Sequence, residues 1–313
     1  MENIVDPRPT REIVKELTKN RFLRKTNYGN NEVYLFTSHE SPALMHEVGR
    51  LREITFRAAG GGTGKAIDLD GYDLSDDAPH TQLIVWDPDN REIIGGYRFF
   101  IHDARNKIPD HKDMASDSIF HFSDDFISNY LPYLIELGRS FVQPDYQSRA
   151  MGRKSLFALD NLWDGLGAIV IENSRLKYFF GKVTMYPHFH EMARSMIIYF
   201  MKKHFSDPDR LVVPIEDISL KMDFSMMELI FTSDNYKDDY KILSQEVRKL
   251  GENIPPLINA YMNLSPSMRT FGTIHNAGFG GVDETGIMIT LRDMYVEKIN
   301  RHLESYREDY DLG

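Results

Sequence analysis

The sequence predicts a mixed α/β protein, and three observations in its 313 residues indicate this fold class. Residues 41–58 carry apolar side chains at helical spacing. Residues 81–86 and 93–101 are strand-like and are joined by the turn sequence DPDN, a pattern typical of a hairpin. Residues 134–142 form a third apolar strand, which a basic, glycine-containing loop connects to a helical run that begins at residue 156.

The elements follow one another without a repeat or a low-complexity tract. Ile13, Val14 and Leu17 indicate a helix within residues 8–19, and residues 31–37 alternate like a strand. Ser41 and Pro42 are suited to the start of the helix at 41–58. Beyond residue 166 we expect strands at 168–171 and 178–183, a helix at 189–204, a charged helix at 236–250, a strand at 287–291 and a terminal helix.

Composition and charge exclude several classes of function. The net charge of −10 argues against a nucleic-acid partner, because general attraction to a polyanion requires positive charge. Cysteine is absent, so the chain has no disulfides, zinc–thiolate sites or thiol nucleophiles. The charged N-terminus has no signal-peptide pattern, and no apolar run approaches the roughly 20 residues of a membrane span. We therefore expect a cytoplasmic protein.

No flexible linker marks a clean domain boundary. We expect one domain over residues 1–205 and a C-terminal α+β extension over residues 206–313, packed on the same body.

Two familiar-looking motifs do not support a nucleotide or metal site. Gly60–Lys65 resembles a phosphate-binding loop, but Ala59 and Ala66 occupy its first glycine and its Ser/Thr position, and a helix precedes it where a strand is required. His188 and His190 have no carboxylate at ligand spacing, so we expect polar residues there and no metal.

The informative motifs are charged. The loop after the strand at 134–142 contains Arg149, Gly152, Arg153 and Lys154, where a helix N-terminus presents N–H groups to a phosphate. Its alternative interpretation is a solvated basic loop. Four further motifs occur in order along the chain: Arg52-Glu-Ile-Thr-Phe56, Asp68-Leu-Asp70-Gly-Tyr-Asp73, Gly95-Gly-Tyr-Arg98 and Glu136-Leu-Gly-Arg139.

The order and spacing of these four motifs resemble the acyl-homoserine-lactone synthases, although Asp68 replaces a glutamate of their pattern. The fuller string ELGRSFVQPDYQ, with FFGKVT and PPLINAYM later, is more similar to the hemolysin-like GNAT proteins that include ornithine-lipid and glycine-lipid N-acyltransferases. This resemblance covers roughly residues 41–295. It implies a GNAT-like mixed, mostly antiparallel central sheet flanked by helices.

The resemblance also assigns roles. Arg149, Gly152, Arg153 and Lys154 would contact the phosphate end of an acyl-phosphopantetheine arm, carried by acyl carrier protein or coenzyme A, with no permanently bound cofactor. The bulky Lys154 replaces a small residue of the family pattern, and it favours the acidic acyl carrier protein as the partner.

Direct acyl transfer requires a base for the attacking amine. The resemblance implies Glu136 for this role, because the central strand that carries it lies beside the thioester in the resembled fold; a strand carboxylate paired to Arg139 is its structural alternative. Arg98 and Arg139 suit an acceptor carboxylate because a guanidinium offers two parallel donors. Asp68, Asp70 and Asp73 crowd three negative charges and require a counter-charge, for which Arg52 is the first candidate. Recognition of the acceptor amine and a solvated turn are their alternatives.

The predicted function is transfer of a 3-hydroxy fatty acyl group from acyl carrier protein to the α-amine of glycine or ornithine. Apolar segments 185–201 and 257–262 would line a cleft for the chain or belong to the core. Lys202, Lys203 and Arg210 offer a peripheral membrane contact. The rival functions are an acetyl-CoA-dependent acetyltransferase, a lactonising signal synthase, and a non-catalytic or membrane-active module.

Overall fold

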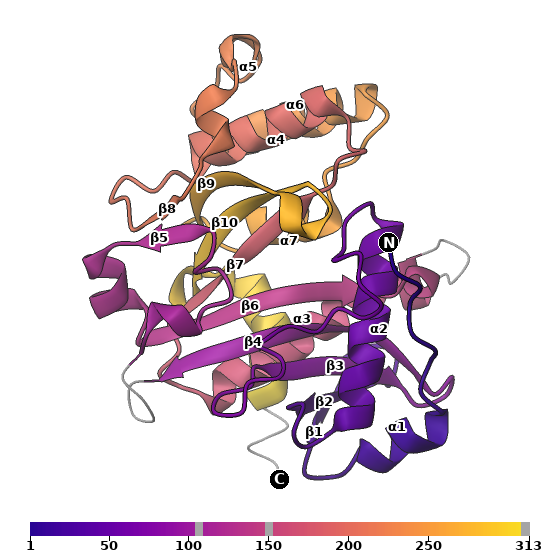
Figure 1. Ribbon diagram of the computed structural model, residues 1–313. Helices are drawn as coiled ribbons and strands as arrows, with labels where there is room; N and C mark the ends of the chain where they lie inside the picture. Colours follow the sequence, from indigo (N-terminus) through magenta and orange to yellow (C-terminus); the bar gives the residue numbers. More distant parts are fainter. Residues whose placement is uncertain (104–108, 148–152, 308–313) are drawn as a thin grey trace. The chain divides into compact units, whose positions relative to one another are not determined.

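The chain forms two compact units, each assembled from separate stretches of sequence. The computed structural model describes residues 1–103, 109–147 and 153–307 (Figure 1). The first unit comprises residues 1–101, residues 135–176 and the C-terminal segment from residue 296. The second comprises residues 102–134 and 177–295. The boundary expected at residue 205 therefore lies inside the second unit, and the chain passes between the units several times.

Five strands form the sheet of the first unit, in the order β1-β2-β3-β4-β6. Their bounds are Phe22–Lys25, Glu32–Phe36, Thr81–Asp87, Glu92–Asp103 and Tyr133–Val142. The pairs β1–β2, β2–β3 and β3–β4 are antiparallel. Val33, Leu83, Ile84 and Val85 are fully buried, so the sheet provides the core of this unit.

Helices cover both faces of that sheet: α2 lies in front of it in Figure 1 and α3 lies behind it. The helices of the first unit are α1 (Thr10–Glu16), α2 (Pro42–Ala58), α3 (Arg153–Glu172) and α8 (Val296–Ile299). A Cβ on Gly165 would lie 2.7 Å from the Leu83 side chain, so this glycine lets α3 approach β3 closely. After α8 the chain packs on α3, where His302 Nδ1 lies 2.8 Å from Asp164 Oδ1.

In the second unit β10 (Val282–Thr290) lies between β7 (Tyr178–Met185) and β9 (Arg269–Asn276), and both pairs are antiparallel. Strands β5 (Phe120–Phe122) and β8 (Val212–Pro214) form a separate antiparallel pair. The helices are α4 (Glu191–His204), α5 (Ser225–Ile230), α6 (Tyr236–Lys249) and α7 (Pro256–Met262). One apolar cluster of this unit includes Met114, Phe120, Phe126, Leu131, Leu134, Phe180, Leu211, Val212, Phe271 and Met288.

The predicted α/β class, with a mostly antiparallel sheet flanked by helices, is confirmed. The helices expected at 41–58, 189–204 and 236–250 are present as α2, α4 and α6. The strand expected at 168–171 is wrong, because these residues continue α3. A short, uniformly apolar run does not distinguish a buried strand from the last turn of a buried helix.

Four short or irregular strands were not expected from the pattern: β1, β5, β8 and β9. Strand β9 has Gly272 at φ +83°, and its pairing with β10 shifts register between Thr285 and Ile287. Such a bulge interrupts the two-residue alternation by which a strand is identified.

Candidate active site

Seven charged residues of the four predicted motifs are placed in the first unit, and we call them the charged cluster. The cluster consists of Arg52, Asp68, Asp70, Asp73, Arg98, Glu136 and Arg139. Six of these side chains are connected to one another by hydrogen bonds or ion pairs. The seventh, Glu136, raises the pKa of Arg98 electrostatically and so lies near it.

Arg52 is the innermost member and is fully buried. It lies on the face of α2 that also buries Val48 and Phe56, at helical spacing from both. Its Nη1 donates to both carboxylate oxygens of Asp73 at 3.1 and 3.2 Å, and its Nη2 donates to Gln82. Burial lowers the pKa of the Arg52 guanidinium, and Asp73 opposes that shift. A buried cation of this kind requires its counter-ion.

A short turn gathers the three aspartates. The Asp70 carboxylate accepts hydrogen bonds from the backbone N–H groups of Tyr72 and Asp73, and the Asp73 carboxylate accepts one from the N–H of Asp70. Aspartate favours such turns because its side chain bonds the backbone a few residues further on. The turn therefore directs several negative charges towards one place, where the arginines lie.

Arg98 on β4 binds two of these aspartates. Its Nη1 lies 2.6 Å from Asp70 and 3.2 Å from Asp73. Burial lowers the pKa of Arg98, but Asp73, Asp70 and Glu136 outweigh burial and raise it well above the ordinary value. Gln82 is the register partner of Arg98 across β3 and β4, and its amide donates to Asp73 at 3.0 Å.

Gln82 is a site residue that the sequence analysis missed. The available signal was a polar side chain within the apolar strand TQLIVW, opposite Arg98 in the predicted hairpin. A buried amide requires partners, so its place there pointed to a polar cluster.

The backbone of β6 has a local distortion at Arg139, whose φ is +49°. Glu136 and Arg139 are three residues apart, and a regular strand would direct them to opposite faces. The left-handed residue breaks this alternation, and Arg139 Nε reaches Asp68 at 3.0 Å while its Nη2 lies 3.5 Å from Asp70. Arg139 thereby joins the same cluster as Glu136, and strained backbone of this kind is frequent at functional sites.

The carboxyl groups respond differently to this arrangement. Burial raises the pKa of Asp70, but Arg98 and Arg139 outweigh it and the pKa lies well below its ordinary value. Burial also raises the pKa of Asp68, and there Arg139 and Arg52 compensate only in part, so the pKa stays raised. Burial therefore disfavours the charged form of Asp68, whereas the two arginines stabilise the charged form of Asp70.

The cluster has an inner and an outer part. The side chains of Arg52 and Asp73 are fully buried, whereas those of Asp70 and Arg139 are 31% and 19% exposed. A substrate would therefore meet Asp70 and Arg139 first. Four carboxylates face three guanidiniums, and the unequal count favours a positively charged group on the incoming molecule.

Glycines 95 and 96 have a steric role next to the cluster. A Cβ on Gly95 would collide with the carbonyl oxygen of Phe141 on β6, and one on Gly96 would lie 2.6 Å from the carbonyl oxygen of Leu83 on β3. The motif Gly95-Gly-Tyr-Arg98 thus lets β4 lie close to its neighbours and carries Arg98 to the aspartates.

The predicted phosphate loop is described only in part. Arg149 and Gly152 lie outside the described residues, while Arg153 and Lys154 are the first two residues of α3. The start of a 20-residue helix has backbone N–H groups without intrahelical partners, which is the feature that the sequence analysis used.

The loop that resembles a nucleotide-binding motif holds an internal anion instead. The buried carboxylate of Glu53 accepts hydrogen bonds from the N–H groups of Thr63 and Gly64 and from the Thr63 hydroxyl. Arg57 also donates to it, at 2.7 Å. These donors would otherwise be available to a phosphate, so the loop closes on its own helix.

His190 and several side chains of the apolar segments have structural roles. His190 Nδ1 accepts a hydrogen bond from the Met192 N–H and caps α4. Over residues 1–103, 109–147 and 153–307, no group of three or more potential metal ligands is gathered. Met185, Met196, Phe200, Ile258 and Met262 are buried in the second unit. No helix in the described part of the chain is long and apolar enough to cross a bilayer.

Comparisons with known proteins identify a family model and two relatives that match this chain. The family model of the acetyltransferase (GNAT) domain matches residues 51–155, a segment that contains the whole charged cluster. A glycine N(alpha)-acyltransferase of Phocaeicola vulgatus is 53% identical over 308 residues, which cover 98% of this chain and 94% of the relative. A glycine N(alpha)-acyltransferase of Bacteroides thetaiotaomicron is 52% identical over 312 residues, covering 99% and 92%. No solved structure matches the chain significantly.

Proposed function

Because the chain belongs to the family of GNAT-type N-acyltransferases that these two relatives represent, we propose that it transfers a fatty acyl group to the α-amine of glycine. The names of both relatives favour glycine over ornithine as the acceptor. The observation that carries the proposal is the charged cluster, in which four carboxylates and three guanidiniums converge within the matched GNAT segment.

The cluster suits a zwitterionic acceptor such as glycine. The excess carboxylate favours the ammonium group, and Arg139, the most exposed of the three arginines, can bind the carboxylate through its guanidinium fork. Arg98 pairs with two aspartates and is only 4% exposed. Its role in this proposal is therefore to orient the Asp70 carboxylate. Glycine has no side chain, so the acceptor needs partners only for its ammonium and carboxylate groups.

The reaction needs a base and an electrophile. Glu136 accepts a proton from the glycine ammonium, directly or through water, and the neutral amine attacks the thioester carbonyl. The C–N bond forms, the C–S bond breaks through a tetrahedral oxyanion, and the thiolate leaves to become the free thiol of the carrier. Backbone N–H groups of β6, next to the distortion at Arg139, are the candidates for stabilising the oxyanion.

The donor in this proposal is a 3-hydroxyacyl thioester on acyl carrier protein. The support is the basic sequence around Arg149, Arg153 and Lys154, which suits an acidic carrier better than a tightly wrapped pyrophosphate. The order of the four motifs, which resembles that of acyl-homoserine-lactone synthases and hemolysin-like GNAT proteins, supports the same donor. The protein would act in the cytoplasm, close to the membrane that receives its lipid product.

The test gives the purified protein three donors: 3-hydroxyacyl carrier protein, the same acyl group on coenzyme A, and acetyl-CoA. Each donor is combined with glycine, ornithine or serine, and products are identified by mass spectrometry. We expect N-acylglycine from the acyl carrier protein. Turnover of acetyl-CoA alone would support the ordinary acetyltransferase, a cyclised product would support a signal synthase, and no turnover would support a binding module.

The same assay tests the catalytic base. Glu136→Gln keeps the size of the side chain and should lower kcat by roughly 10²- to 10⁴-fold, the usual contribution of a general base. Glu246→Gln is the control, because Glu246 lies on α6, outside the charged cluster, and pairs with Lys249 three residues away. An unchanged rate in Glu136→Gln would remove that role from Glu136 and leave the acyl transfer itself standing.

A further inference from the structure

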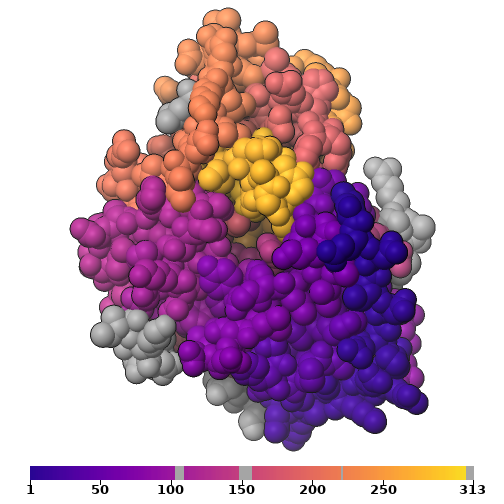
Figure 2. Space-filling model, viewed as in Figure 1, coloured from indigo at the N-terminus to yellow at the C-terminus, as the bar shows by residue number. Residues whose placement is uncertain are grey.

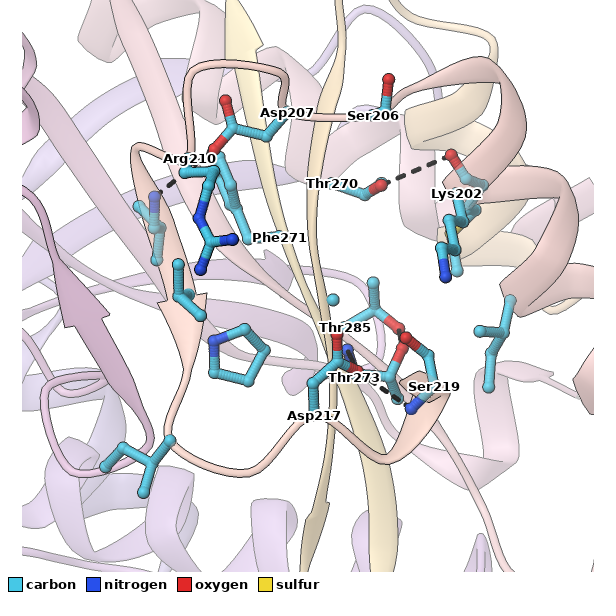
Figure 3. A pocket seen from close by; sticks show the side chains of 17 residues that line it. Lys202, Ser206, Asp207, Arg210, Asp217, Ser219, Thr270, Phe271, Thr273 and Thr285 are labelled. Carbon is cyan, nitrogen blue, oxygen red and sulfur yellow. Dashed lines mark hydrogen bonds between the residues drawn. The ribbon is translucent and has the colours of Figure 1, made fainter. Parts of the chain in front are cut away.

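A cavity in the second unit has no part in the chemistry described above. Its volume is about 450 Å³, and it lies among α4, β8, the following loop to residue 219, and β9 (Figure 3). This volume is within the range of roughly 300 to 1,000 Å³ that is typical of small-molecule sites. All of its lining residues belong to the second unit.

Two cations extend into the cavity. Figure 3 shows Lys202 and Arg210 on opposite sides of the group of residues that line the cavity. Lys202 Nζ lies 5.5 Å from the ring centroid of Phe224, a cation–π contact. Within residues 1–103, 109–147 and 153–307, neither cation has a carboxylate at ion-pair distance. Both are therefore available to an anion from solution.

Two carboxylates also line the cavity, but the protein already uses them. Asp207 pairs with Arg269 at 2.9 Å and accepts the N–H of Leu211 at 2.6 Å. Asp217 accepts the N–H groups of Ser219 and Thr273. These donors hold the two aspartates in place and offset part of their negative charge. Asp207 and Asp217 therefore do not serve as counter-ions for Lys202 and Arg210.

The remaining wall is largely apolar. Side chains from α4, β8 and β9 form it: Ile198, Met201, Val213, Pro214, Ile215 and Phe271. The hydroxyls of Thr273 and Thr285 bond each other at 2.8 Å, and the Thr270 hydroxyl donates to the Phe205 carbonyl at 3.1 Å. These three threonine hydroxyls are thus bonded within the protein, which leaves hydrocarbon contact as the main interaction that this wall offers.

We propose that this cavity binds an amphipathic anion, a molecule with one alkyl chain and one anionic head group. The chain packs on the apolar wall, and the head group lies between Lys202 and Arg210. Fatty acids and alkyl phosphates share this chemistry. An N-acylglycine shares it too. Only this last identification rests on the proposed function, because N-acylglycine is the product of the proposed reaction.

The segment that contains Arg210 and Ile215 is accessible from solvent. Residues around 206–230, orange in Figure 2, lie at the surface of their unit, and Ile215 is 52% exposed. A ligand can therefore enter without unfolding of the unit. Lys203, which the sequence analysis grouped with Lys202 and Arg210, is not part of this surface, because it donates to Asp239 at 2.8 Å and to two backbone carbonyls.

The test locates the ligand directly. The full-length protein is irradiated with a fatty acid and with an N-acylglycine that carry a diazirine on the alkyl chain, and the labelled peptides are mapped by mass spectrometry. We expect label in residues 198–219 and 269–273. The double variant Lys202→Gln/Arg210→Gln should lower this labelling about tenfold, because charge-assisted contacts to the head group are lost.

Two controls keep the result specific. Lys241→Gln removes an exposed charge on α6, outside the cavity, and should label like the parent. An alkyl probe with a trimethylammonium head should not label the cavity. Equal labelling by the cationic probe, or undiminished labelling of the double variant, would overturn the proposal.

A membrane surface is the competing partner for the same cations. Sedimentation with phosphatidylcholine vesicles, with and without phosphatidylglycerol, measures it. If the double variant loses vesicle binding while the diazirine acids never label the cavity, the cations serve a bilayer and the cavity proposal fails. Acyl transfer assayed in parallel separates this outcome from a failure of the proposed function, because Lys202 and Arg210 lie outside the charged cluster.

Discussion

The charged cluster of the first unit and the cavity of the second use their cations in opposite ways. In the cluster, Arg52, Arg98 and Arg139 each have an aspartate oxygen within 3.2 Å. In the cavity, Lys202 and Arg210 have no carboxylate at ion-pair distance in the described parts of the chain. The arginines of the cluster are therefore paired before any ligand binds, whereas the two cations of the cavity have no counter-ion among the described residues.

This difference follows from burial. A fully buried guanidinium such as that of Arg52 cannot stay charged without a partner, so the fold supplies one. Lys202 and Arg210 are solvated, and water stabilises them until an anion binds. The cluster should therefore respond to mutation mainly through stability and geometry, and the cavity mainly through ligand affinity.

The largest expected effect on stability is that of Arg52→Met. The substitution removes one of the two guanidiniums that pair with the buried Asp73 carboxylate and leaves only Arg98 at ion-pair distance, which should lower the free energy of unfolding by about 3–5 kcal/mol. Urea denaturation measures it. Arg307→Met is the control, because Arg307 is 55% exposed and, among the described residues, pairs with Glu304 alone, so it should change little. A loss for Arg52→Met as small as the control's would mean that Asp73 is compensated by other groups.

The second prediction concerns the spacing of the strands that carry the cluster. Gly95→Ala would force its Cβ against the Phe141 carbonyl and should cost about 1–3 kcal/mol, with a fall in kcat because Arg98 shifts. Gly138→Ala is matched to it, since a Cβ there meets nothing within 4 Å. Equal stability of the two variants in urea would show that β4 and β6 can separate freely.

The sequence predicted the members of the cluster better than their connections. Resemblance selected Arg52, Arg98, Glu136, Arg139 and the aspartates, and helical and strand periodicity placed the first three on the correct elements. The sequence did not predict the ion pair between Arg139 and Asp68, because the spacing in a regular strand puts Arg139 and Glu136 on opposite faces. The left-handed backbone conformation of Arg139 brings the two side chains into one cluster, and an arginine in the sequence does not predict that conformation.

Long-range pairing limited the prediction elsewhere. Lys202 and Lys203 are equivalent in the sequence, yet only Lys203 meets Asp239, which is 36 residues away. The cavity likewise lies between α4 and β9. The sequence did not predict β9 as a strand, because its pattern is irregular. Local periodicity contains no information on which distant side chain covers which neighbour.

The third prediction uses the opposite pKa shifts of two aspartates in the cluster. The lowered pKa of Asp70 means that its contribution to stability is present above about pH 4, the ordinary range of aspartate, and is lost as the pH falls below it. The difference in Tm between the parent and Asp70→Asn should therefore shrink from pH 6 to pH 3. Asp68 has a raised pKa, so the contribution of its protonated form is lost as the pH rises, and the Asp68→Asn difference should change in the opposite direction. Parallel changes for both variants would contradict the assigned roles.

The smallest expected effect on stability belongs to the cavity. Lys202→Gln and Arg210→Gln should each change the free energy of unfolding by less than about 0.5 kcal/mol, because each removes a solvated charge without an ionic partner. Lys203→Gln, one residue away, breaks the pair with the buried Asp239 carboxylate and should cost about 1–3 kcal/mol in the same urea experiment. If Lys202 were as costly as Lys203, it would be a structural cation, and the cavity would lose half of its anion-binding charge. Two adjacent lysines on one helix thus test whether an unpaired charge is available for a ligand.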